Sequence, residues 1–221
     1  MRLIGEFGYQ GGVLCCSGVP VPKILESVPH TRGVTPAYIY SGRGITCNCH
    51  TMKTAFSQAK IHFAVKACMN VAILRRMNHE GIGFDVVSHG ELNRAALTNA
   101  RGRDVVYAGA AKSDWEISEA VGFGATIVVE RPEELPLISV AANALGKNTD
   151  ILLRLRPNVD AHTHQHLTTG TAFSKFGMPA DLVNEIIAGW SDRRVKIRGL
   201  HFHIGSQITA MPWNAITPAA S

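Results

Sequence analysis

Short apolar runs alternate with amphipathic stretches from Ile61 onward, and this alternation restricts the possible folds more than any other feature of the chain. The runs are nearly continuous in apolar residues, which is typical of parallel strands covered on both faces. The stretches between them have the apolar spacing of surface helices. The predicted strands are Ile61–Lys66, Phe84–Val87, Val105–Ala108, Thr126–Val129, Ile151–Leu155 and Ile197–Ile204. These six units predict an α/β fold with a parallel sheet and helices outside it.

A barrel explains the alternation better than a doubly wound sheet does. A doubly wound sheet usually carries a glycine-rich phosphate-binding turn after its first strand, and no such turn follows Ile61–Lys66. We therefore predict a (β/α)8 TIM-type barrel, a fold that typically takes ~250 residues. Thr209–Ser221 contains Pro212 and Pro218 and no apolar helical stripe, so it does not continue the alternation. The expected barrel is truncated after about six strands.

Three segments are expected along the chain: residues 1–36, a partial barrel over residues 37–208, and a tail over residues 209–221 outside the barrel pattern. The elements predicted before Ile61 are a strand and turn over Phe7–Val21, a short helix over Pro22–Val28 with proline in its first turn, a strand over Ala37–Tyr40 and a helix that contains Thr51–Gln58.

Composition excludes several classes of protein. Hydrophobic residues make up 46% of the 221 residues and charged residues 18%, which is typical of a globular protein with a core. No apolar run reaches the ~20 residues of a transmembrane helix, and the net charge of +5 is spread along the chain, so we expect neither a membrane nor a nucleic-acid partner. The five cysteines match no zinc-binding spacing and no secretory signal precedes them, which predicts a reduced, cytoplasmic protein.

Ionisable residues lie at or near the ends of four predicted strands. They are Lys66, Asp85, Arg154 and His203, on the first, second, fifth and sixth strands. Catalytic groups of barrel enzymes come from the carboxyl ends of strands, so these four side chains are expected to converge on one site. An unpaired ammonium group is costly to bury, and a lysine that closes a buried strand therefore indicates a function.

Side-chain alternation along the strands adds detail to this site. Successive side chains point to opposite faces of a strand, so His62 and Ala64 are expected on the same face as Lys66. The small side chain of Ala64 leaves room inside the barrel. His201 and His203 are likewise expected to share a face.

Several motifs resemble those of the fold-type III pyridoxal-phosphate decarboxylases. Phe63–Asn70 is similar to their lysine motif, Gly83–Ser88 to their second-strand motif and Lys112–Ile117 to their third. Within that superfamily two stretches, Leu153–Gly177 and Gly199–Ile208, resemble the diaminopimelate decarboxylases. Phe7–Pro20 is also similar to the opening of that family, so the resemblance extends over residues 7–208.

The resemblance implies a fold, a cofactor and residue roles. The fold would be the alanine racemase-like barrel that binds pyridoxal 5'-phosphate, with residues 1–36 belonging to a β-domain. Lys66 would hold the cofactor as a Schiff base, His203 would pack on its ring and Ser206 would lie near its phosphate. Asp85 and Arg154 would form a charged pair that supports the lysine and the ring.

The implied activity is decarboxylation of meso-2,6-diaminopimelate to L-lysine and CO2, the last step of lysine biosynthesis, in a homodimer. Cys68, Arg156 and Ala111 stand where that family usually has asparagine, asparagine and glycine. The C-terminal half of the family pattern, with its phosphate loop and substrate-binding residues, does not follow Ile208. We therefore expect the chain to be inactive by itself.

Three alternatives remain open. Another decarboxylase of the superfamily would act on ornithine, arginine or carboxynorspermidine. A non-catalytic remnant would bind pyridoxal phosphate without turnover. A metal-dependent barrel hydrolase would use the dense histidines, which are His162, His164, His166, His201 and His203, because a His-x-His pair on a barrel strand can bind zinc.

Overall fold

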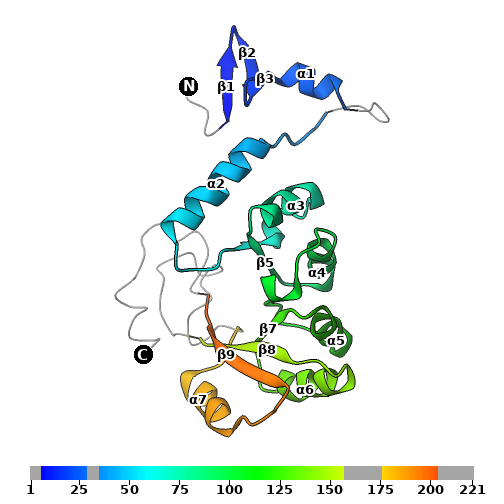
Figure 1. Ribbon diagram of the computed structural model, residues 1–221, viewed down its shortest axis with the longest axis vertical. Coiled ribbons are helices and arrows are strands. Elements are labelled where there is room, and N and C mark those ends of the chain that lie inside the picture. Colours follow the sequence, from blue (N-terminus) through cyan, green and yellow to red (C-terminus); the bar gives the residue numbers. More distant parts are fainter. Residues whose placement is uncertain (1–5, 29–34, 157–175, 204–221) are drawn as a thin grey trace.

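The chain forms two separate sheets joined by one long helix (Figure 1). The computed structural model describes residues 6–28, 35–156 and 176–203. Its strands are β1 (Phe7–Gln10), β2 (Val13–Cys16), β3 (Val19–Pro20), β4 (His62–Ala64), β5 (Gly83–Val86), β6 (Val105–Tyr107), β7 (Thr126–Val129), β8 (Thr149–Arg154) and β9 (Val195–His201). Its helices are α1 (Val21–Glu26), α2 (Gly42–Ala55), α3 (Val71–His79), α4 (His89–Ala96), α5 (Asp114–Phe123), α6 (Glu134–Ala144) and α7 (Ala180–Gly189), with 3-10 turns η1 (Val65–Ala67) and η2 (Gly102–Asp104).

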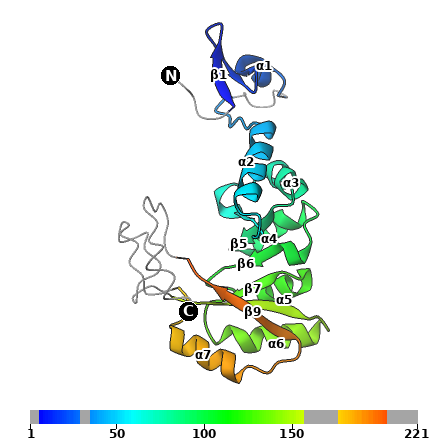
Figure 2. The same ribbon diagram turned by 60° about the vertical axis from the view of Figure 1, so that its left-hand side comes forward.

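The larger sheet confirms the predicted barrel class. Its six strands are all parallel, and their spatial order β4-β5-β6-β7-β8-β9 is the order of the chain. A doubly wound sheet would reverse its strand order at some point, and this sheet does not. Helices α3 to α6 follow one another along one side of the sheet in both views (Figures 1 and 2). This arrangement is that of an incomplete (β/α) barrel, with β4 and β9 as the outer strands of the described sheet.

The smaller sheet is antiparallel, with β2 between β1 and β3. It lies with α1 beyond the far end of α2 (Figures 1 and 2). The helix α1 has proline in its first turn, as predicted. This small unit confirms the prediction that the N-terminal segment contributes to a β-domain. No helix in the described ranges is long and apolar enough to cross a lipid bilayer.

The strand predicted over Ala37–Tyr40 is wrong. These residues have no regular structure, and the side chain of Tyr38 is 91% exposed. The rings of Tyr38 and Tyr40 stack on each other, with centroids 6.5 Å apart, and no strand among the described residues pairs with this segment. The backbone groups of a strand need a neighbouring strand as hydrogen-bond partner. The β-branched and aromatic residues of this segment favour an extended strand but do not provide such a neighbour.

The helix that follows starts nine residues earlier than Thr51, since α2 begins at Gly42. Ser41 accepts a hydrogen bond from the amide of Gly44 at 2.9 Å, which caps the first turn. Gly42 and Gly44 have low helix propensity, so the sequence gives no clear indication that the helix begins there. The cap and the packing of α2 against α3 outweigh that propensity.

The core lies between the larger sheet and its helices. Every second strand residue faces the helices, as Phe84 and Val86 do in β5 and Ile151 and Leu153 do in β8. Burial of such side chains contributes roughly 25 cal/mol per Å² of apolar surface. The intervening strand residues point to the opposite face, which is the interior of the incomplete barrel.

Candidate active site

The interior face of the sheet carries the predicted polar groups. Asp85 lies on this face because its neighbours Phe84 and Val86 face the helices. Arg154 lies on it for the same reason, next to Leu153. Parallel pairing sets Asp85 beside Ala64 and Arg154 beside His201. The alternation predicted from the sequence therefore holds in β5 and β8, whereas the pairing of β8 with β9 has a register shift between Ile151 and Leu152.

Lys66 is not where the sequence placed it. The strand β4 ends at Ala64, and Lys66 lies in the 3-10 turn η1 with an exposed side chain. Val65 is fully buried instead, because the turn directs it into the core. The prediction that Lys66 closes a buried strand is therefore wrong. The amine of Lys66 is accessible at the carboxyl edge of the sheet, where its charge acts on Asp85 and His203.

Asp85 has a buried carboxylate oxygen without a partner. Its Oδ1 accepts no hydrogen bond within the described part of the chain. Burial raises the pKa of Asp85, while the positive charges of Lys66 and Arg154 act in the opposite direction and Glu91 adds to the rise. An unsatisfied buried polar atom costs free energy, so this oxygen indicates a binding position.

Arg154 makes its ion pair with Glu130 rather than with Asp85. Its Nη1 donates to Glu130 Oε1, and both side chains are buried. The guanidinium also lies over the ring of Phe176, 4.8 Å from the centroid, a cation–π contact. No ion pair joins Arg154 to Asp85 among the residues that the structure describes, although the two charges are close enough to interact.

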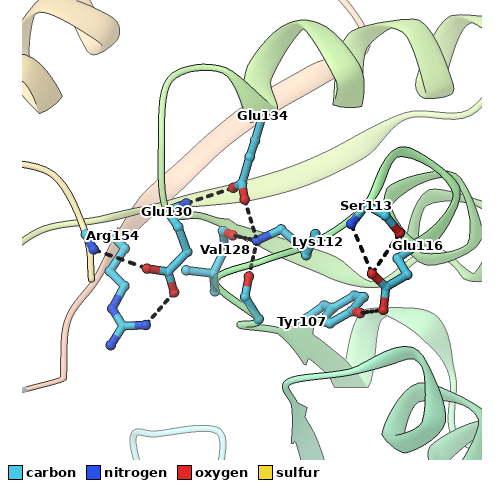
Figure 3. A network of polar contacts seen from close by, with 10 residues as sticks. Tyr107, Lys112, Ser113, Glu116, Val128, Glu130, Glu134 and Arg154 are labelled. Carbon is cyan, nitrogen blue, oxygen red and sulfur yellow. Dashed lines mark hydrogen bonds and ion pairs between the residues drawn. The ribbon is translucent and has the colours of Figure 1, made fainter. Parts of the chain in front are cut away.

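A second buried ion pair supports the first (Figure 3). Lys112 Nζ lies 3.1 Å from Glu134 Oε1 and donates to the carbonyl of Val128 at 2.8 Å. Glu134 Oε2 in turn accepts the amide of Glu130 at 2.9 Å. Burial lowers the pKa of Lys112 and raises that of Glu134, and each partner's charge opposes the shift of the other. The network ties the end of β7 to α6 and to the loop before α5.

Two histidines complete the edge of the site at β9. The strand ends at His201, so the half-buried His203 lies two residues beyond the strand and not at its end. Burial, with Arg154 and Lys66, lowers the pKa of His203. Burial, with Arg154, His203 and Lys112, lowers that of His201 to about 4, and its Nδ1 is buried without a partner in the described region. Both imidazoles are neutral at pH 7.

The residues that the structure brings together are Lys66, Asp85, Arg154 and His203, linked by their mutual electrostatic effects. Ser206 lies outside the described residues, as do His162, His164 and His166. No group of three or more potential metal ligands occurs in the described ranges.

These residues fit pyridoxal phosphate. A primary amine at Lys66 can condense with its aldehyde, and the imidazole of His203 can lie against a flat ring. The partnerless Oδ1 of Asp85 offers an acceptor to a cationic or hydrogen-bonding group.

Comparison with known proteins decides the family. Residues 43–217 match the family described as "Pyridoxal-dependent decarboxylase, pyridoxal binding domain". The chain belongs to the pyridoxal-dependent decarboxylases. This confirms the resemblance and the fold class that the sequence predicted.

The most similar relatives include several diaminopimelate decarboxylases. The Deinococcus radiodurans protein is 41% identical over 174 residues, covering 79% of the chain and 44% of the relative. The Haemophilus influenzae protein is 36% identical over 209 residues, covering 93% of the chain and 49% of the relative. The chain thus spans about half the length of these curated relatives and is similar to their N-terminal portion.

Solved structures agree with this. Diaminopimelate decarboxylase from M. jannaschii superposes with a TM-score of 0.81 at 29% identity, covering 93% of the chain and 49% of that structure. The Helicobacter pylori enzyme, complexed with L-lysine, superposes with a TM-score of 0.74 at 30% identity, covering 85% of the chain and 47% of that structure.

Sequence reasoning missed three members of the site, Glu130, Glu134 and Lys112. Glu130 directly follows the apolar run Thr126–Val129, so it satisfied the rule that selected the other strand-end residues. Glu134 and Lys112 lie on a helix start and in a loop, and nothing in their local sequence shows that their side chains meet.

Proposed function

We propose that the chain forms the pyridoxal-phosphate site of a decarboxylase that converts meso-2,6-diaminopimelate to L-lysine and CO2. The observation that carries the proposal is the convergence of Lys66, Asp85, Arg154 and His203 at one edge of the sheet. These side chains come from four separate segments of the chain. The names of the relatives support the choice of substrate.

Each residue has a role in this proposal. The cofactor, when bound, supplies an electron-withdrawing ring that stabilises the charge left on the substrate carbon by CO2. Lys66 Nζ would hold the cofactor through its aldehyde, and the same amine could carry a proton to the substrate carbon. His203 packs against the ring as a neutral imidazole. Asp85 Oδ1 would accept a hydrogen bond from a polar group of the bound molecules, and Ser206 would hold the phosphate.

The assembly and the limits of the domains belong to the same proposal. We propose a cytoplasmic homodimer with a small amino-acid substrate, since the H. pylori relative binds L-lysine. We propose that the chain is divided into three segments, over residues 1–36, 37–208 and 209–221. The relatives contain about as much chain again, so residues 1–221 alone are expected to capture the cofactor without releasing CO2.

Borohydride trapping tests the site in residues 1–221. Incubation with pyridoxal phosphate and reduction should leave an adduct on the Lys66 peptide, detected by mass spectrometry. Lys66→Ala should abolish that adduct, whereas Lys196→Ala, which removes an exposed lysine of β9, should leave it unchanged. A label spread equally over the surface lysines would contradict the site.

Decarboxylation is tested on the protein in its full length. CO2 release should be faster from meso-2,6-diaminopimelate than from L-ornithine, L-arginine or carboxynorspermidine. Faster release from a polyamine precursor would reassign the substrate, and trapping without any turnover would indicate a non-catalytic cofactor-binding protein.

A further inference from the structure

Glu130 uses both of its carboxylate oxygens on groups at the edge of the site (Figure 3). Oε1 accepts from Arg154 Nη1, and Oε2 accepts the amide of Gly177 at 3.1 Å. The Glu130 side chain is 2% exposed and that of Arg154 8%. A buried ion pair costs several kcal/mol of desolvation per ion, so stability alone gives little reason to place one here.

The orientation of Arg154 is set from two sides. Glu130 binds one edge of the guanidinium, and the ring of Phe176 lies beneath it. Gly177, at φ +71°, brings the chain so close that an added Cβ would lie 2.9 Å from the Arg154 carbonyl. The amide of Met178 donates to that same carbonyl at 2.8 Å. The end of β8 and the segment before α7 are thus held as one unit by Glu130.

Glu130 is itself held by the second ion pair. Its amide donates to Glu134 Oε2, and Glu134 is bound to Lys112. Lys112 in turn donates to the carbonyl of Val128, two residues before Glu130. The Glu130 side chain therefore extends from backbone that is held in place by hydrogen bonds to the buried side chains of Glu134 and Lys112.

Arg154 lies near a carboxylate with which it does not pair. Its charge acts on Asp85, whose buried Oδ1 has no partner in the described part of the chain. An Arg154 guanidinium without Glu130 would be a buried, uncompensated charge, and Asp85 is a carboxylate on the same face of the sheet on which that charge acts.

We propose that Glu130 is a positioning residue, which holds Arg154 and Gly177 so that Asp85 Oδ1 stays available to the ligands of the site. The inference rests on the proposed function for the identity of those ligands. The hydrogen bonds of Glu130 to Arg154 and Gly177 do not depend on the identity of those ligands.

The test replaces Glu130 and Arg154 singly and together. In each variant the pKa of His203 is measured in the cofactor-free chain. Glu130→Gln keeps the side-chain length and an acceptor for Gly177 but removes the negative charge. The uncompensated Arg154 should then lower the pKa of His203 by about half a unit, measured by NMR titration of its ring protons. Arg154→Gln should raise that pKa, and the double variant should lie between the two.

Controls separate positioning from general stability. Glu130→Asp keeps the charge and should keep the His203 pKa close to that of the parent, even if thermal stability falls. Glu133→Gln makes the same chemical change at an exposed neighbour and should leave the pKa unchanged. If Glu130→Gln fails to fold, the double variant, which leaves no uncompensated charge, still tests the pair against Arg154→Gln. Equal His203 pKa values in all variants that fold would overturn the inference.

The bound cofactor gives a second readout. In the parent chain the absorbance of captured pyridoxal phosphate should change with pH at a midpoint that Glu130→Gln lowers, because the site becomes more positive. A parent chain that captures no cofactor at Lys66 would overturn the proposed function while the His203 titration still decides the role of Glu130. A midpoint unchanged in Glu130→Gln would count against Glu130 alone.

Discussion

At the scale of single residues, burial separates the charges of this site into two kinds. Lys112, Glu134, Glu130 and Arg154 are buried and paired, whereas Lys66 is exposed and Asp85 Oδ1 is buried without a partner. Paired charges orient their neighbours, and the accessible or partnerless groups can bind a ligand. The local sequence does not distinguish the two kinds, because the partner of each charge comes from another segment.

Lys112→Ala is expected to lower the free energy of unfolding by about 3–5 kcal/mol, because it leaves Glu134 buried and uncompensated. Urea denaturation measures the change. Lys196→Ala, at an exposed position of β9, should change stability by less than about 0.5 kcal/mol. Similar losses in the two variants would show that the Lys112–Glu134 pair is of no special importance.

At the scale of elements, a helix cap joins three parts of the barrel. Glu116 Oε2 accepts the amide of Ser113 at 3.0 Å and completes the capping box of α5. Its Oε1 accepts the hydroxyl of Tyr107 in β6 at 3.1 Å and the amide of His89 at the start of α4 at 3.4 Å. A capping box is a local sequence motif, whereas the hydrogen bonds of Glu116 to β6 and α4 depend on packing.

Glu116→Gln keeps an acceptor in the capping box but removes a negative charge from the start of the helix, so stability at pH 7 should fall by about 0.3–1 kcal/mol and depend less on acid pH. The Ser113 amide, the largest cause, holds the pKa of Glu116 below its usual 4.5 in the folded chain. The contribution is therefore full above the unfolded-state value and is lost as pH falls through the lower folded value. Urea denaturation between pH 3 and 7, with Glu119→Gln on the same helix as control, measures this. The prediction fails if the two variants show the same pH dependence.

At the scale of the whole molecule, α2 lies between the small sheet and the barrel, and two of its side chains contact the carboxylate of Glu80. Glu80 accepts from Thr46 Oγ1 at 2.9 Å and lies 2.9 Å from His50 Nε2, both on α2. The carbonyl of Glu80 also accepts from Lys53 at 2.9 Å. Three side chains of α2 are therefore attached to the end of α3 through polar contacts with this residue.

Glu80→Ala is expected to raise amide hydrogen exchange in α2 several-fold while β7 and β8 keep theirs, because local opening depends on local contacts. Exchange measured by mass spectrometry gives the result peptide by peptide. Glu26→Ala, an exposed change at the end of α1, serves as the control. Unchanged exchange in α2 would show that apolar packing against α3 is sufficient.

The sequence by itself determined the barrel class and the order of its strands, and it predicts Lys66, Asp85, Arg154 and His203 as candidate site residues. The spacing of apolar residues and the position of a residue at the end of a strand are local properties, so both can be read from the sequence. The failures were also local: Ala37–Tyr40 has strand composition without a partner, and the turn at Val65 moves Lys66 out of β4.

Only the tertiary structure decided which charge pairs with which. Arg154 could have paired with Asp85 or with Glu130, because both carboxylates follow from the same alternation along the strands. The choice depends on how close β7 and β8 lie and on the buried pair that fixes the end of β7. Distances between separate segments arise from packing, and for that reason the partner of Arg154 could not be predicted from the chain alone.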